Sequence, residues 1–141
     1  MISVIPKVGL ATAALLAALV LSFATKAEDR KLTGKEIHAT FAGTAADGYD
    51  LDDNIRYKVE FAKNGSLRLM YNYHSPRPIK LEGKWWIEGD LWCRAIRRSP
   101  RVTRPEPTKC QTVIEQDGAY IFIDPDGTRV SRIYVRDIKK R

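Results

Sequence analysis

The sequence is poor in the residues on which enzyme and metal chemistry depend. It contains two histidines, His38 and His74, and two cysteines, Cys93 and Cys110, with no zinc-ligand spacing between the two kinds. Gly-x-Ser-x-Gly, His-Glu-x-x-His and phosphate-loop motifs are missing. Ser75 directly follows His74, and neighbours on an extended chain point apart, so they form no nucleophile–base pair. We therefore predict no enzyme activity, no cofactor and no metal site.

One long apolar run is present near the start of the chain. It covers Val8–Phe23, follows Lys7 and ends in small residues before Glu28. This order of charge, apolar run and small residues is typical of a secretory signal peptide. We expect residues 1–27 to be that peptide, although cleavage before Thr25 also fits, and we expect a periplasmic or secreted protein. An uncleaved anchor is the alternative, but the run of 16 residues is shorter than the about 20 that span a bilayer.

The remaining residues, 28–141, suffice for a single β-rich domain and are too few for two. They contain 22 Lys and Arg against 17 Asp and Glu, a net charge of +5. This basicity is too small to imply a nucleic-acid partner, which an exported protein rarely meets. We expect membrane contact only through an uncleaved leader, and the sequence carries no signal for an oligomeric state.

The two cysteines should form a disulfide, because paired cysteines are the rule in exported proteins. Two free buried thiols are the alternative. Cys93 lies near the start of a predicted strand and Cys110 opens the next strand, so the two need not be directly opposite. A disulfide therefore predicts that the connecting loop folds back, or that the first strand is shorter than 91–96.

A short helix is predicted after the leader. Thr33 and Glu36 form a capping box, and Ile37 and Phe41 lie on one helical face. Gly43 is a plausible stop. So short a helix needs a larger surface to pack on.

From residue 55 onward, apolar and polar residues alternate with the period of a strand. Turn signals such as Asn64-Gly65 separate the runs, whereas 28–31 reads as a frayed lead-in and 44–54 as an irregular connection. The fold class is mainly β, with a short N-terminal helix packed on a curled antiparallel meander of about seven strands. Barrel and sandwich both remain open, because strand shear is not readable from sequence. The predicted strands are 55–61, 67–73, 80–88, 91–96, 110–116, 119–123 and 128–135.

A basic loop between and beside the cysteines is the first candidate binding site. A planar guanidinium fork suits phosphate or carboxylate, and the loop's net charge equals that of residues 28–141. The partner would be an anionic envelope component or an acidic protein. A merely solvated loop is the alternative. Its charged residues are Arg94, Arg97, Arg98, Arg101, Arg104, Glu106 and Lys109.

Aromatic residues on adjacent predicted strands form the second candidate site. They are Trp85, Trp86 and Trp92, with Tyr71 and Tyr73. Successive strand residues face opposite sides, so one of Trp85 and Trp86 must face away from the core. The outer rings could line a groove for a sugar or an apolar ligand. The alternative is that one Trp is core and the helix covers the other.

Several short segments together resemble those of small exported bacterial proteins, commonly from alphaproteobacteria, that are grouped only as families of unknown function. The resemblance implies a fold and brings no catalytic or binding residues. A more distant likeness is to periplasmic lysozyme inhibitors, but a basic chain suits an acidic target better than a basic lysozyme. The segments are Leu32-Thr33-Gly34, Asn64-Gly65, Gly83-Lys84-Trp85-Trp86, Gly89-Asp90, Leu91-Trp92-Cys93, Cys110 and Asp117-Gly118.

These observations together favour a non-enzymatic periplasmic or secreted binding module that contacts an anionic partner through its basic loop. Two alternatives remain open at this point. One is a small-ligand carrier that uses the Trp and Tyr side chains. The other is an inhibitor or accessory subunit of an envelope enzyme.

Overall fold

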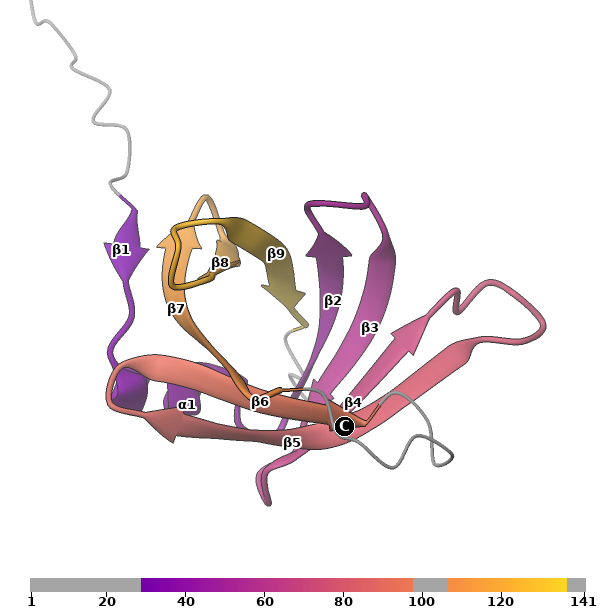
Figure 1. The fold of residues 1–141 in the computed structure, drawn as a ribbon, viewed down its shortest axis with the longest axis horizontal. Coiled ribbons are helices and arrows are strands. Elements are labelled where there is room, and N and C mark those ends of the chain that lie inside the picture. The colour runs from indigo at the N-terminus through magenta and orange to yellow at the C-terminus, as the bar shows by residue number, and fades with distance from the viewer. Residues whose placement is uncertain (1–28, 98–106, 137–141) are drawn as a thin grey trace, which may run out of the picture.

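The computed structural model describes residues 29–97 and 107–136. This part of the chain forms one helix and nine strands, shown in Figure 1. They are β1 (Arg30–Lys31), α1 (Gly34–Phe41), β2 (Thr44–Asp50), β3 (Arg56–Phe61), β4 (Ser66–Tyr71), β5 (Ile79–Glu88), β6 (Leu91–Arg97), β7 (Lys109–Gln116), β8 (Ala119–Ile123) and β9 (Arg129–Val135).

The strands form a closed antiparallel barrel. Strands β2 to β9 pair with their neighbours in chain order, and β9 pairs back with β2 to close the cycle of eight. The predicted mainly β meander is therefore confirmed, with eight barrel strands in place of about seven, and the open choice between barrel and sandwich is resolved. Closure gives each of these eight strands a partner on both sides over at least part of its length, which reduces exposed sheet edges.

The prediction of an irregular connection over 44–54 is wrong for residues 44–50, which form β2. Gly and Asp are depleted in strands, so local composition argued against one. Non-local packing decides here, because β2 lies between β3 and β9 and bonds to both. Its inward residues are small: a Cβ on Gly48 would lie 2.2 Å from ring atoms of Tyr57, so only glycine fits beside that ring.

The frayed lead-in predicted for 28–31 is also wrong for Arg30 and Lys31. These residues form β1, which pairs with the C-terminal half of β7. The next residue, Leu32, is buried, and its backbone N–H donates to the carbonyl oxygen of Val113 at 2.9 Å. Burial of Leu32 fixes the strand before it, and sequence periodicity over two residues gives no signal of this.

The predicted capping box is confirmed at the start of α1. The backbone N–H of Glu36 donates to the Thr33 hydroxyl, and the Thr33 N–H donates to the Glu36 carboxylate, both at 3.2 Å. The helix ends before Gly43, whose φ of 75° suits glycine. Among the described residues, no helix has the length and hydrophobicity to cross a membrane.

The helix closes one end of the barrel, beside the β5–β6 turn (Figure 1). The Gly34 N–H donates to the Asp90 carboxylate of that turn at 2.8 Å. Ile37 and Phe41 are fully buried, and the Phe41 ring lies 4.9 Å from the ring of Phe61. The helix therefore supplies apolar side chains that the strands alone would leave in water.

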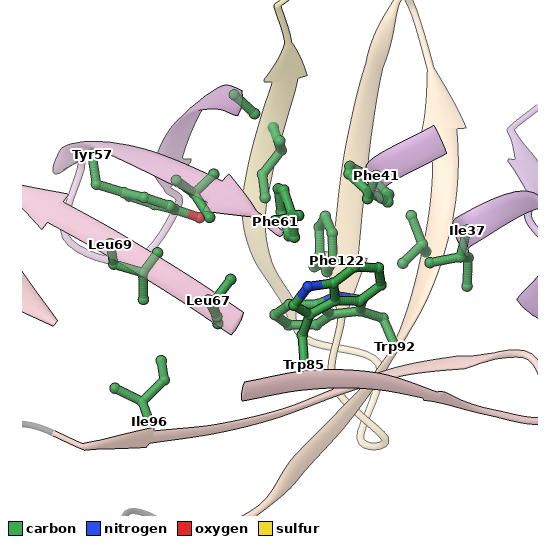
Figure 2. Close-up of a cluster of buried hydrophobic side chains, with 14 of the residues drawn as sticks. Ile37, Phe41, Tyr57, Phe61, Leu67, Leu69, Trp85, Trp92, Ile96 and Phe122 are labelled. Carbon is green, nitrogen blue, oxygen red and sulfur yellow. The ribbon is translucent and has the colours of Figure 1, made fainter. Parts of the chain in front are cut away.

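Aromatic side chains fill the barrel next to α1, as Figure 2 shows. Trp92 packs edge-on against Phe122 at 4.9 Å and against Phe61 at 6.0 Å. Trp85 packs edge-on against Phe61 at 5.9 Å. Edge-to-face contacts of this kind add stabilisation beyond buried area. The α1 end of the barrel is thus solid.

The predicted disulfide joins Cys93 and Cys110, which are directly opposite each other on β6 and β7. The predicted shortening of the first strand is wrong, because β6 runs on to Arg97, whereas the alternative of a loop that folds back falls on residues 98–106, outside the described residues. β7 pairs with β6 only over Trp92–Arg94, so the rest of β6 extends along β5 alone. The disulfide reinforces the barrel's shortest pairing between consecutive strands.

We predict that Gly34→Ala lowers the free energy of unfolding by about 2 kcal/mol. An added Cβ would lie 1.9 Å from the carbonyl oxygen of Gly89, where backbone cannot move aside. In an open helix the same change would stabilise. Urea unfolding measures the effect, and Lys35→Ala, an exposed change on the same helix, is the control. A variant as stable as the wild type would contradict this packing.

We predict that replacing both cysteines by alanine lowers the free energy of unfolding by about 3 kcal/mol, since the 17-residue separation constrains the unfolded chain. Thermal and urea unfolding measure the loss. Wild-type protein treated with reductant is the matched control and should show a similar loss. No effect from either treatment would mean that the disulfide does not stabilise the fold.

Candidate functional site

The structure does not bring the three tryptophans into one groove. Trp85 and Trp92 face inward and are buried, and the Trp85 indole N–H donates to the carbonyl oxygen of Ala62 at 3.0 Å. Trp86 is half-buried and faces outward, as the alternation along β5 requires. The prediction that Trp85 and Trp86 face opposite ways is confirmed, and the inward one lies against α1, with the His38 ring 5.8 Å away.

The predicted basic loop is only partly within the described residues. Arg98, Arg101 and Arg104 lie outside them. Arg97 ends β6, is exposed, and pairs in register with Glu82 on β5. Arg94, unlike Arg97, faces into the barrel, as the alternation of residues along β6 requires.

A separate cluster of cations lies on the outside of the barrel, over β2, β3 and β9. It lines an open hollow of about 720 Å³. We call this surface the basic face. Four cations and three tyrosines surround one carboxylate there, so the charge is strongly unbalanced. Its side chains are Asp47, Tyr49, Arg56, Lys58, Tyr73, Arg132, Tyr134 and Arg136.

Strand register arranges the basic face in two cross-strand rows. Tyr49 on β2 lies between Arg56 on β3 and Arg132 on β9. In the next row Asp47 lies between Lys58 and Tyr134. Residues directly opposite in an antiparallel pair have side chains in contact range. The register therefore puts a tyrosine between two arginines, a combination suited to a ligand with both charge and a flat surface.

The single carboxylate of the basic face is held by one arginine. The Arg136 Nε donates to Asp47 Oδ2 at 2.8 Å, and a second guanidinium nitrogen contacts Oδ1. The hydrogen bonds from Arg136 lower the pKa of Asp47 and raise the pKa of Arg136. Both side chains are about half exposed, so the pair adds little stability. Its main effect is to orient Arg136 and neutralise Asp47.

The other cations of this face keep their charge available. The Lys58 ammonium lies 4.7 Å from the centre of the Tyr73 ring, a cation–π contact that leaves its charge intact. Within the described part of the chain, no ion pair involves Arg56 or Arg132. These side chains can therefore donate to an incoming anion without first breaking an ion pair.

The outer wall over β3 to β6 has the opposite arrangement. Its cross-strand row reads Glu60, Arg68, Glu82 and Arg97, so acids and bases alternate. Opposite charges across a strand pair satisfy each other. This row is balanced, in contrast to the basic face.

A small cavity, of about 20 Å³, lies in the barrel interior beside the aromatic cluster. Tyr57 lines it, and burial raises the pKa of its phenol to about 12, while a hydrogen bond with Ser131 acts the other way. Arg94, Trp92 and Gln111 also line it. A cavity of this size holds one water molecule and no organic ligand.

Glu88 lies against the disulfide, with its Oε2 3.4 Å from Cys93 Sγ and 3.5 Å from Cys110 Sγ. Two cysteines and a carboxylate this close resemble a metal-ligand set. Bonded sulfurs, however, carry neither a proton to donate nor a thiolate to coordinate a metal. The cluster is therefore a disulfide with a neighbouring carboxylate.

The two histidines are engaged by aromatic rings. His38 is next to Trp85, and the His74 ring lies 4.2 Å from that of Tyr73. They come from opposite ends of the barrel, one on α1 and one after β4. The structure does not bring them together into a shared site.

Comparison with known proteins adds no relative. No protein-family model matches the chain, and no curated protein or solved structure does either. The basic face is therefore interpreted from its own geometry.

Sequence reasoning missed the basic face because β2 was not predicted as a strand. The alternation of Arg56 and Lys58 with inward residues was visible, as was that of Arg132 and Tyr134. Asp47 and Tyr49 follow the same period. Only barrel closure brings these three strands together.

We predict that spectrophotometric titration shows one tyrosine ionising near pH 12, and that this step is missing in Tyr57→Phe. Burial raises the pKa of this phenol in the folded protein above its ordinary value of 10.0, so folding favours the neutral phenol. Its stabilising contribution is present below pH 10 and is lost as the pH rises toward 12. Loss of a step near pH 10 in Tyr57→Phe would contradict the buried position of this phenol.

Proposed function

We propose that this protein is a non-enzymatic binding module, periplasmic or secreted, that holds an anionic envelope component or an acidic protein. The basic face is the observation that carries the proposal. Arg136 pairs with the single carboxylate, Asp47. The other cations, Arg56, Lys58 and Arg132, lie on strands β3 and β9, which hold side chains more firmly than loops do. The predicted basic loop would be a second contact.

The spacing of the cations suits a ligand with repeated charges. Arg56 and Lys58 are two residues apart on β3, about 7 Å along the strand, and Arg132 lies across β2 from them. A polymer with a charge on each unit can contact several of these cations at once, which raises affinity through multivalency. Tyr49 between two arginines favours an acidic polysaccharide, whose rings can lie on its phenol, over an acidic peptide.

The loop leaves the described structure at the end of β6, which is four strands from β2 in a cycle of eight. Its point of departure is therefore on the side of the barrel away from the basic face, and a polymer is the kind of ligand long enough to contact both Arg97 and the basic face. Location in an oxidising compartment is supported by the disulfide. The resemblance to small exported bacterial proteins agrees with this.

We expect Arg56→Ser/Arg132→Ser to elute from an acidic-polysaccharide resin at clearly lower salt than the wild type, because bound cations set the salt dependence of polyanion binding. Lys80→Ser/Lys84→Ser is the matched control, since it removes two exposed cations from β5, outside the basic face. Equal shifts for the two variants would show that only net charge matters and would overturn the site.

A third variant, Arg98→Ser/Arg101→Ser/Arg104→Ser, separates the loop from the basic face. A larger shift for this variant than for Arg56→Ser/Arg132→Ser would assign the main contact to the loop. Retention on a poly-glutamate resin separates the two partner classes. Stronger retention there than on the polysaccharide would favour an acidic protein.

A further inference from the structure

Among the described residues, the end of the barrel away from α1 is left uncovered and is partly apolar. It forms a hollow of about 760 Å³, in the size range of small-molecule sites. Ile55 is 39% exposed and Ile79 is 51% exposed, and both line it beside Leu81 and Tyr71. Large apolar side chains left in water around a concave surface commonly mark a ligand site. We call this hollow the mouth.

Arg94 connects the mouth with the barrel interior. It lines both the mouth and the small cavity below it, and it is half-buried. No ion pair within the described residues involves Arg94. A cation taken partly out of water without a counter-charge is costly, and an anion arriving from solvent would relieve that cost.

Trp92 lines the same cavity and carries a buried indole N–H. Trp92 is only 4% exposed, and its indole Nε1 is the buried side-chain nitrogen or oxygen without a hydrogen-bond partner in the described structure. The neighbouring Gln111 amide donates to Asp124 at 2.8 Å and so is already used. Within the described residues, the groups here without a partner are thus the Arg94 guanidinium, which has no ion pair, and the Trp92 indole N–H, both donors. An oxygen acceptor would satisfy them.

The mouth has a basic side and an acidic side. Lys109 lies opposite Arg94 on the neighbouring strand β7. Asp50 ends β2, across the barrel, and Asp53 follows it in the next turn. Asp50 also accepts the backbone N–H of Asp52 at 3.0 Å, which fixes its carboxylate on that side. The acidic side would repel a second negative charge on a ligand.

We propose that the mouth binds a small amphiphilic carboxylate. Its carboxylate pairs with Arg94, and one oxygen enters the cavity that Trp92 lines. Its apolar body lies against Ile55, Ile79 and Leu81. A carboxylate carries a single charge, whereas a phosphate monoester carries close to two and would meet the acidic side. This site is independent of the basic face and goes beyond the proposed function.

Calorimetric titration of the purified chain with octanoate and with octan-1-ol tests the proposal. The wild type should bind octanoate more tightly than octanol. Arg94→Met keeps the length and apolar stem of the side chain, and it should weaken octanoate binding about tenfold, with little effect on octanol. Arg97→Met, an outward-facing change on the same strand, is the matched control and should leave both affinities unchanged.

The proposal is overturned if the wild type does not bind octanoate at millimolar concentration, or if Arg94→Met and Arg97→Met behave alike. If Arg94→Met fails to fold, Ile79→Ser replaces it, since this half-exposed side chain tolerates change. That variant should weaken both ligands, and unchanged affinity would overturn the apolar contact. Arg56→Ser/Arg132→Ser should bind octanoate normally, so a failure of the basic face leaves this test intact.

Discussion

Closure of the barrel depends on the close packing of β2 against the ring of Tyr57. No side chain larger than hydrogen fits at Gly48, because a Cβ there would overlap the phenol ring. This contact lets β2 lie between β3 and β9 and bond to both, which completes the cycle of eight strands. The basic face depends on the same contact, since β2 carries the tyrosine and carboxylate at its centre.

Both candidate sites result from the alternation of strand residues between the outside and the inside of the barrel. Outward residues of β2, β3 and β9 form the basic face, and inward residues of the barrel form the core and the mouth. Aromatic rings fill the α1 end, so the interior offers a ligand only the opposite end. Arg94 lies where the apolar filling stops, at the boundary between solid core and open mouth.

Features with local signals could be predicted from the sequence. The capping box of Thr33 and Glu36, the Asn64-Gly65 hairpin and the disulfide each depend on few residues or on cellular chemistry. β2 could not be predicted, because its residues form a strand only through their hydrogen bonds to β3 and β9. The basic face could not be predicted for the same reason, since register between segments about 80 residues apart has no local signature.

The disulfide also makes the barrel independent of the length of the connection between β6 and β7. Cys93 and Cys110 hold the two strands together on the barrel side of that connection, so its ends stay close whatever its length. The entropic cost of closing this loop then grows only slowly with its length, and it does not disturb the barrel strands. This makes the connection the natural place to insert a foreign peptide or to vary binding specificity without redesigning the barrel.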